Sequence, residues 1–305
     1  MNKNVRDISI FAIATAVVLT FIIYNADLSK KNAAQVAEVR IAAEDARIAA
    51  ENARKKAEQE KADFMNLESE IRSYAASDES RNGLIYYDLT INTSIEINPD
   101  MEFAAASTVK VPMNMAFMDL AQKGIVDFES SMEYTESDYE GGTGILQGKD
   151  RSEPIPLRTL SEYSIVYSDN IATQMIIRKI GRDVMYDSFS KMAGREVART
   201  GNMTTAAANA AYLKRLHTNP DNNPYYEFLI TNMKNTIFHD RIDKYIPQEL
   251  TAHKIGNYAS YVNDVSIIYT DRPYVLVVFT NGVSDAPEKI AQISKMIYEY
   301  QAGLE

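Results

Sequence analysis

The stretch Phe103-Ala-Ala-Ala-Ser107-Thr-Val-Lys110-Val-Pro112 places a serine at the start of an apolar helix and a lysine three residues later. At about 100° per residue, Ser107 and Lys110 share one helix face, one turn apart. Unpaired N–H groups and the dipole at a helix N-terminus favour negative charge on the hydroxyl oxygen. A lysine desolvated between apolar residues can become the base that a serine nucleophile needs. The spacing alone is weak evidence, because Ser188 and Lys191 share it.

Two later motifs carry polar groups of the kind that an acyl-transfer site uses. Ser168-Asp169-Asn170 lies between helical patterns at residues 157–166 and 171–180. The simplest interpretation of this motif is that Ser168 caps the second helix, and a functional turn is the alternative. The other motif, Lys254-Ile255-Gly256-Asn257, lies in a strand pattern that begins at residue 249.

A glycine-rich segment, residues 139–145, raises the question of a phosphate-binding loop. No Lys-Ser or Lys-Thr pair follows it, and no helix clearly begins there, so the phosphate-loop motif is incomplete. We therefore expect a mobile loop near a site.

Strand patterns occur at both ends of the region from residue 76 onward, with helical patterns between them. Alternating apolar residues predict strands at 83–90, 93–98, 249–257, 262–270 and 274–280, and the last element is an amphipathic helix over 286–300. This order predicts an α+β fold in which both ends of the domain complete one antiparallel sheet and helical layers hold the loops.

Composition excludes several classes of function. The 305 residues carry a formal charge of −10, which argues against a general nucleic-acid binder. The chain has no cysteine, so disulfides, thiolate catalysis and Cys-zinc sites are excluded. Its three histidines are His217, His239 and His253, and no pair of them has metal-ligand spacing. The sequence therefore predicts neither a metal site nor a cofactor.

An uncharged run from Ile8 to Tyr24 follows a short N-terminal tail, residues 1–7. Its length is just sufficient to cross a hydrocarbon core of roughly 30 Å, and no clear cleavage site follows it. We expect residues 8–24 to be a transmembrane anchor rather than a removed signal. Lys and Arg balance at its two ends, so charge does not decide the orientation.

Residues 25–75 are rich in Ala, Glu, Arg and Lys and contain no Gly or Pro. Apolar residues recur at alternating spacings of three and four, mostly as alanine, which predicts a long helical stalk with a narrow seam. An alanine seam buries little surface. A single solvated helix stabilised by Glu–Arg and Glu–Lys pairs and a self-associating coiled coil therefore both stay open.

The three motifs occur together in the order Ser107-x-x-Lys110, Ser168-Asp169-Asn170 and Lys254-x-Gly256, each on a fitting element. In this respect residues 76–305 resemble the class A β-lactamase-like serine hydrolase family, which includes β-lactamases and penicillin-binding proteins. The resemblance implies a β-lactamase/transpeptidase-like fold. It also implies that the serine attacks a carbonyl and forms an acyl-enzyme.

The resemblance also assigns roles to the other residues of these motifs. Lys110 would take or relay the proton of Ser107, and Ser168 would pass a proton to the leaving nitrogen. The backbone N–H groups of Ser107 and Asn257 would form the oxyanion hole. The predicted catalytic residues are Ser107, Lys110 and Ser168, and the predicted substrate-binding residues are Asn170, Lys254, Gly256 and Asn257.

Two departures from the family pattern bear on activity. Ile255 lacks the hydroxyl that the family uses to hold the substrate carboxylate, and one such charge-assisted hydrogen bond is worth about 1.5–3 kcal/mol. The family's β-lactamases also carry a Glu-x-x-Leu-Asn segment whose glutamate activates the deacylating water. That segment is missing here, and Glu196 is the sole carboxylate in the short run 192–203. We therefore expect deacylation to be slow.

The sequence thus predicts a membrane-anchored serine hydrolase that acts outside the cytoplasmic membrane on β-lactams or D-amino-acid cell-wall peptides. The extracytoplasmic location is implied by the resemblance. The alternatives are a β-lactamase with an unusual deacylating group and a non-catalytic wall-binding module that keeps a degenerate pocket.

Overall fold

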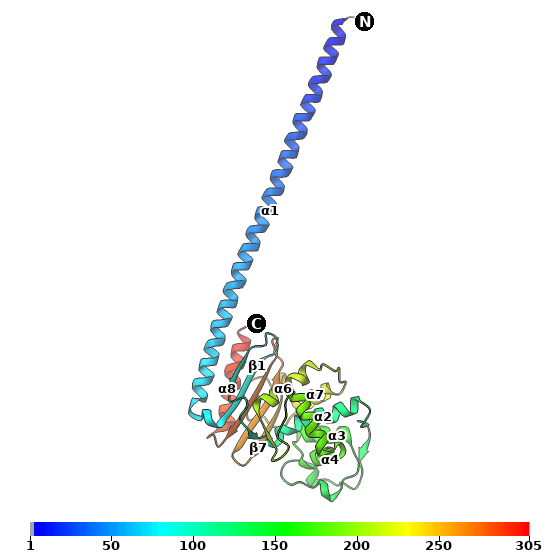
Figure 1. Cartoon of the computed structure of the whole chain (residues 1–305), viewed down its shortest axis with the longest axis vertical. Helices are drawn as coiled ribbons and strands as arrows, with labels where there is room; N and C mark the ends of the chain where they lie inside the picture. Colours follow the sequence, from blue (N-terminus) through cyan, green and yellow to red (C-terminus); the bar gives the residue numbers. More distant parts are fainter. Residues whose placement is uncertain (1–2, 305) are drawn as a thin grey trace. The chain divides into compact units, whose positions relative to one another are not determined.

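The computed structural model describes residues 3–304, without the side chains of residues 3–14, 77, 79 and 80. The chain divides into two compact units, Met1–Asp63 and Phe64–Glu305. Helix α1 (Lys3–Ala75) begins in the first unit and ends in the second (Figure 1).

The first unit has the exposed, charged surface of a solvated helix. Val36 and Val39 of the predicted seam are 54% and 63% exposed. Ion pairs one turn apart link residues along the helix, as predicted for a solvated helix: Arg47–Glu44, Arg54–Glu58 and Lys55–Glu51. Self-association through the seam stays a prediction.

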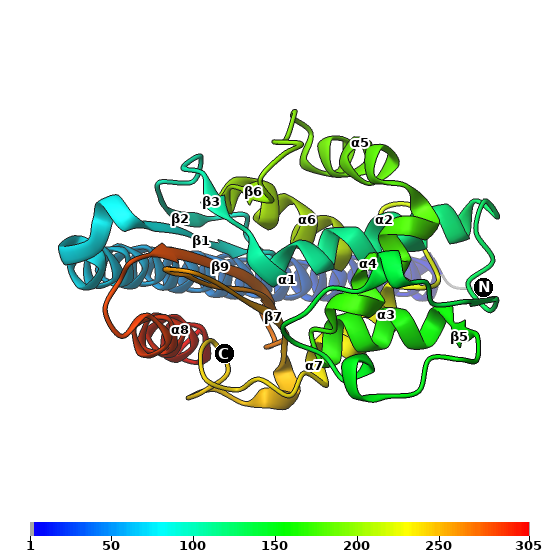
Figure 2. The ribbon, with the colours of Figure 1, turned by 90° about the horizontal axis from the view of Figure 1, so that it is seen from below.

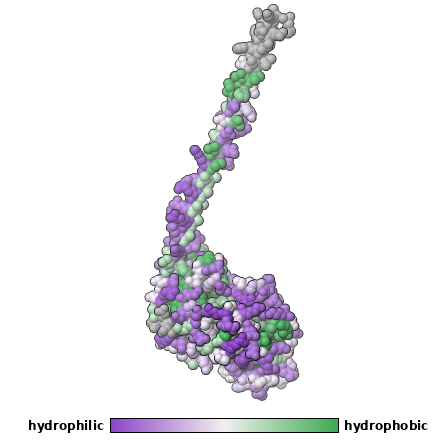
Figure 3. Space-filling model, viewed as in Figure 1, coloured by the Kyte–Doolittle hydropathy of each residue, from purple (hydrophilic) through white to green (hydrophobic). Residues whose placement is uncertain are grey.

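The predicted transmembrane anchor, residues 8–24, lies partly outside the residues whose side chains the structure describes. Within the described part of the chain, no helix combines the length and the apolar character that crossing a bilayer requires. The apolar side chains of residues 17–19 and 21–23 are exposed on α1 (Figure 3).

A five-stranded antiparallel sheet forms the centre of the second unit, in the order β2-β1-β9-β8-β7. Both ends of the domain contribute to it, which confirms the predicted α+β fold. Its strands are β1 (Asn82–Asp88), β2 (Ser94–Ile97), β7 (Thr251–Tyr258), β8 (Tyr261–Ile268) and β9 (Tyr274–Asn281).

Helices cover both faces of this sheet (Figure 2). Along β1, Leu84 and Tyr86 pack in one apolar cluster and Ile85 packs in the other, because successive side chains of a strand point to opposite faces. The first cluster includes side chains of α8 (Ala286–Ala302), and the second includes α2 (Lys110–Gln122) and α6 (Ala206–Thr218).

The end of α1 belongs to this second unit. Leu67 and Ile71 are 4% and 0% exposed and pack in the cluster that contains Ile293 and Ile297 of α8. The compact unit therefore begins at Phe64, earlier than the predicted boundary at residue 76. The reason is that Phe64, Leu67 and Ile71 replace the small alanines of the preceding seam and can bury a large apolar surface.

The remaining elements build the helical region and its loops. The helices are α3 (Leu157–Val166), α4 (Asn170–Ile180), α5 (Arg182–Ala193) and α7 (Tyr226–Lys234). Short strands pair β3 (Phe103–Ala104) with β6 (Met203–Thr204) and β4 (Ser131–Met132) with β5 (Ile155–Pro156). The 3₁₀ turns are η1 (Ala76–Arg81), η2 (Ala106–Val109), η3 (Glu136–Asp138), η4 (Leu146–Gly148) and η5 (Gln248–Leu250).

The strand β7 lies directly against η2, the turn that carries Ser107. A Cβ atom added at Gly256 would lie 2.7 Å from the carbonyl oxygen of Ala105 and 3.1 Å from the backbone nitrogen of Ser107. Both contacts are with backbone, which cannot move aside as a flexible side chain does. Glycine at position 256 therefore sets how closely the edge of the sheet approaches the serine.

We predict that Gly256→Ala lowers the free energy of unfolding by about 1–3 kcal/mol, because the added methyl group forces β7 and η2 apart. Urea denaturation followed by circular dichroism measures the change. Gly148→Ala is the matched control, since nothing lies within 4 Å of the added Cβ. A Gly256→Ala protein as stable as this control would contradict the proposed close contact.

Candidate active site

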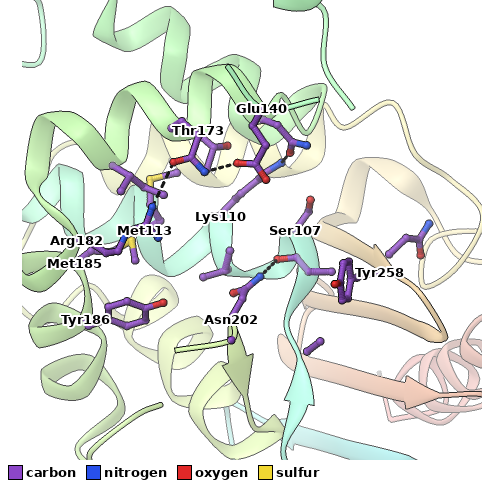
Figure 4. A pocket seen from close by; sticks show the side chains of 18 residues that line it. Ser107, Lys110, Met113, Glu140, Thr173, Arg182, Met185, Tyr186, Asn202 and Tyr258 are labelled. Carbon is purple, nitrogen blue, oxygen red and sulfur yellow. Dashed lines mark hydrogen bonds between the residues drawn. The ribbon is translucent and has the colours of Figure 1, made fainter. Parts of the chain in front are cut away.

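Ser107 lies between two clefts in the second unit. The first cleft has a volume of about 410 Å³ and is lined by Ser107, Lys110, Asn170 and Asn257, among others (Figure 4). The second has a volume of about 330 Å³ and is lined by Ser107, Ser168 and Asn257. The structure therefore places all three predicted catalytic residues, with Asn170 and Asn257, around the space in front of one serine.

The backbone before Ser107 is strained. Ala106 has a φ of 50°, a left-handed conformation that residues with a Cβ rarely adopt. Ser107 follows in the 3₁₀ turn η2, and Lys110 begins α2. Strain of this kind persists where the surrounding structure holds it, and it is common at functional sites. The serine is thus presented to the clefts by a tight turn rather than by the first turn of an α-helix.

Lys110 is the central charged group of the site. Its side chain is 3% exposed. Its Nζ donates to the carbonyl oxygen of Ser168 (2.7 Å), the hydroxyl oxygen of Ser168 (3.1 Å) and Oδ1 of Asn170 (2.8 Å). Burial lowers the pKa of Lys110 to about 7, although the carboxylates of Asp169 and Glu140 oppose the shift. Near neutral pH, this amine can therefore both hold and release a proton.

The turn at Ser168-Asp169-Asn170 lies against the buried amine of Lys110 and also leads into helix α4. Asp169, not Ser168, caps α4, because its Oδ1 accepts a hydrogen bond from the N–H of Ala172. The capping interpretation of Ser168 is therefore wrong. Ser168 instead takes a left-handed φ of 53° and lies 3% exposed beside Lys110. The short carboxylate of Asp169 reaches the N-terminus of α4 and leaves the serine hydroxyl for the site.

The glycine-rich segment lies next to this turn, as predicted for a loop near a site. Thr143 donates its hydroxyl to the carbonyl oxygen of Ser168 (2.8 Å), and Oδ2 of Asp169 accepts from the N–H groups of Ile145 and Leu146 (2.7 Å each). A Cβ atom at Gly144 would overlap the carboxylate of Asp169 at 2.4 Å. The glycine thus allows the loop to approach this carboxylate closely.

Lys254 occupies a different position from the one its expected role suggests. It is 0% exposed and is absent from the described residues that line the two clefts. Its Nζ donates to the carbonyl oxygen of Ile255 (3.1 Å) and lies 5.5 Å from the ring centroid of Phe238. Burial, together with the positive charges of Lys110 and Arg241, holds the pKa of Lys254 well below its usual value. Lys254 therefore lies behind the wall of the second cleft.

Sequence reasoning missed Arg241, which lies in the segment between α7 and β7. Arg241 is 1% exposed and lines the second cleft. It donates to the carbonyl oxygen of Asn263 and to Oδ1 of Asn257, each at 2.7 Å. Asn257 is thus held beside Ser107 by a buried guanidinium. No periodic pattern in this irregular segment could have indicated the arginine.

The carboxylate that lines the first cleft is not Glu196, the one that the sequence analysis considered. Glu196 lines a separate surface hollow with Asp187 and Arg199, so the structure does not bring it to the Ser107 cleft. Of the described residues that line the first cleft, Glu140 is the carboxylate, and it accepts a hydrogen bond from Gln174. Its position directly before the glycines of the 139–145 segment was the available signal.

The end of the first cleft that lies across from Tyr258 is partly apolar. In Figure 4, Met185 and Tyr186 lie across the cleft from Tyr258, together with the cationic side chain of Arg182. The cleft therefore has space beside Ser107 for a molecule that carries an apolar part and an anionic group.

The fold is similar to solved structures of penicillin-binding proteins and β-lactamases. PBP-A superposes with a TM-score of 0.71 and 22% identity, over 78% of this chain and 96% of that one. A PBP-A mutant described as an acyl-enzyme complex with penicillin G has the same TM-score and identity. The TLA-3 extended-spectrum β-lactamase has a TM-score of 0.69 and 20% identity, over 77% of this chain and 98% of that one.

Sequence relatives are also β-lactamases. The Bacillus licheniformis enzyme is 31% identical over 121 residues, which span 40% of this chain and 36% of that enzyme. The Bacillus amyloliquefaciens enzyme is 29% identical over 127 residues, which span 42% of this chain and 40% of that enzyme. β-Lactamase VEB-1 of Pseudomonas aeruginosa matches more broadly, at 23% identity over 77% of this chain and 90% of that enzyme.

A family model described as the β-lactamase enzyme family matches residues 66–301. This range begins near the start of the compact unit at Phe64 and includes the sheet and both clefts. The chain therefore belongs to the β-lactamase enzyme family and carries a β-lactamase-like serine hydrolase domain.

Proposed function

We propose that this protein is a serine acyl-transfer hydrolase that acts on β-lactams or D-amino-acid cell-wall peptides through an acyl-enzyme on Ser107. The observation that carries this proposal is the buried amine of Lys110. It shares the first cleft with Ser107 and lies 3.1 Å from the hydroxyl of Ser168. Membership of the family and the likeness to PBP-A support the substrate class.

The first step is attack by the serine. Neutral Lys110 accepts the proton of Ser107 as Oγ forms a bond to the substrate carbonyl carbon. The carbonyl oxygen becomes an oxyanion, which the backbone N–H groups of Ser107 and Asn257 would stabilise. Each donor of this kind is typically worth about 3–4 kcal/mol of barrier.

The second step is release of the leaving nitrogen. Lys110 now carries the proton and contacts the hydroxyl oxygen of Ser168. Because a serine hydroxyl both accepts and donates, Ser168 can take this proton from Lys110 while giving its own to the leaving nitrogen. The C–N bond breaks, the carbonyl re-forms, and Lys110 returns to its neutral form.

Among the described residues that line the first cleft, Glu140 is the carboxylate that could serve as the base for deacylation. Glu140 is exposed and hydrogen-bonded to Gln174, and it lies on a loop rather than on a packed element. The chain between α5 and β6 is short and lacks the Glu-x-x-Leu-Asn segment. We therefore propose that the acyl-enzyme is long-lived, which is the behaviour of a penicillin-binding protein rather than of a resistance enzyme.

Incubation with a fluorescent penicillin tests the proposal. We expect mass spectrometry to find the adduct on Ser107, and Ser107→Ala should abolish labelling. Ser188→Ala, in the second Ser-x-x-Lys sequence, should label normally. Glu140→Gln should change the adduct lifetime by less than about tenfold, since a true general base typically contributes 10²–10⁴-fold.

Two other outcomes would contradict the proposal. A wild-type protein that labels no more than Ser107→Ala would exclude penicillin acylation and favour the wall-binding module. Rapid loss of the adduct that Glu140→Gln slows by more than about 10²-fold would instead identify a β-lactamase with an unusual base.

The acylation rate should depend on pH through Lys110. Because its pKa is lowered to about 7, the neutral form that accepts the proton is lost below that pH. We expect the second-order rate of acylation to fall about tenfold per pH unit below pH 7 and to level off above it. Stopped-flow labelling across the pH range measures this profile. A rate that keeps rising to about pH 10 would show that Lys110 has an ordinary pKa and would contradict the mechanism.

We further propose that residues 8–24 anchor the protein in the cell membrane, with the domain on the extracytoplasmic side. The uncharged run from Ile8 to Tyr24 supports the anchor, and the substrate class supports the orientation. A chain without residues 1–24 should move from the membrane to the soluble fraction after alkaline extraction. Full-length protein recovered in that soluble fraction would refute the anchor.

A further inference from the structure

A cluster of two histidines and two aspartates lies at the wall of the second cleft and behind it, and includes none of the residues assigned to acyl transfer. His239 and Asp243 come from the segment between α7 and β7, and His253 and Asp264 come from the neighbouring strands β7 and β8. His239 lines the cleft and is exposed, whereas the other three side chains are at most 2% exposed. The cluster therefore extends from the surface of the cleft into the domain.

The imidazole nitrogens converge on the carboxylate of Asp243. Nδ1 of His239 contacts Oδ2 of Asp243, and Nε2 of His253 lies 3.2 Å from the same oxygen. One ligand atom from each of these three residues can be chosen so that all lie within 4.8 Å of one another. Imidazole nitrogens together with a carboxylate oxygen are the donor set that zinc and similar divalent ions prefer.

Two buried polar atoms in the cluster lack hydrogen-bond partners among the described residues. They are Nε2 of His253 and Oδ1 of Asp243, on side chains that are 1% and 2% exposed. Nε2 nevertheless lies within ion-pair distance of Oδ2 of Asp243, so Oδ1 of Asp243 is the atom that is left without a partner. A buried polar atom without a partner is costly and calls for an explanation, and an ion bound between these groups is one.

Asp264 orients the buried imidazole. Nδ1 of His253 lies 3.1 Å from both carboxylate oxygens of Asp264, which also accepts the N–H of Ile242 at 3.2 Å. This contact places the Nδ1 proton toward Asp264 and leaves Nε2 to face Asp243. Metal-binding histidines commonly donate their second N–H to a carboxylate in this way.

We propose that His239, Asp243 and His253 bind one zinc-class divalent ion, with Asp264 as the carboxylate that orients His253. Bonds of about 2.0–2.2 Å in a tetrahedral site place ligand atoms roughly 3.3 Å apart. The 3.2 Å separation between Asp243 and His253 meets this requirement. The exposed ring of His239 can move so that its nitrogen comes closer to the ligand atoms of Asp243 and His253. A water molecule from the second cleft would complete the coordination.

The ion would join two segments that form the wall of the second cleft. Residues 239–243 contain Arg241, which holds Asn257 at 2.7 Å, and His253 is adjacent to Lys254 on β7. Binding would therefore fix the strand that lies against Ser107. Because its ligands do not include the residues assigned to acyl transfer, the ion would have a structural role.

Titration of the metal-free, detergent-solubilised full chain with zinc chloride tests the proposal. Isothermal titration calorimetry should find one ion per chain, and cobalt(II) should give the visible absorption of a tetrahedral nitrogen and oxygen site. His239→Gln, at an exposed position, should weaken the affinity by more than about 100-fold. His217→Gln is the matched control and should bind as the wild type does, because His217 lies outside the cluster.

A second variant separates a built site from adventitious surface binding. Asp243→Asn should lose binding to the same extent as His239→Gln, with circular dichroism showing that the variant is folded. Less than one ion per three chains, or wild-type affinity in His239→Gln, would overturn the proposal and leave His253 as an imidazolium held between two carboxylates. None of these readouts needs acylation of Ser107, so they succeed or fail independently of the proposed function.

Discussion

The buried amine of Lys110 is the interaction on which the site depends. A lysine ammonium taken out of water costs several kcal/mol unless hydrogen bonds compensate. Here the carbonyl oxygen of Ser168 and Oδ1 of Asn170 supply that compensation at 2.7 and 2.8 Å. The amine therefore joins the start of α2 to the turn before α4. The same desolvation that makes these contacts necessary also lowers the pKa of the amine to about 7.

The surrounding structure maintains this arrangement. Asp169 accepts hydrogen bonds from the start of α4 and from the backbone of the glycine-rich loop, so it holds both segments around Ser168. On the other side, Gly256 allows β7 to lie against the turn that carries Ser107. Three segments that are distant in the sequence thus meet at the serine. The carboxylate of Asp169 accepts hydrogen bonds from two of them, and the missing side chain of Gly256 lets the third approach closely.

The strand β7 separates two kinds of buried charge. Since successive residues of a strand point to opposite faces, His253 and Lys254 enter different environments. His253 lies between Asp243 and Asp264, whereas Lys254 is influenced by the positive charges of Lys110 and Arg241 as well as by the carboxylate of Asp264. Adjacent residues therefore contribute to two sites, and a change in the position of this strand would affect both.

The local sequence determined those features of this protein that depend on interactions between residues close together in the chain. The spacing of Ser107 and Lys110, the alternation in the strands and the charged helix before residue 64 are properties of neighbouring residues. Each was predictable, as was the α+β order of the elements. The three motifs also indicated the family before any distance between them was known.

Tertiary structure alone decided which distant groups meet and which side chains lose contact with water. It placed Lys254 behind the cleft, Glu196 outside it and Glu140 beside it, and it brought Arg241 to Asn257. The compact unit begins at Phe64, and the packing brings His253 of β7 to His239 and Asp243, which lie on another segment. The burial of a side chain and its distance from other groups depend on how whole elements pack. Because packing sums many contacts between segments far apart in the chain, no local sequence pattern predicts these contacts.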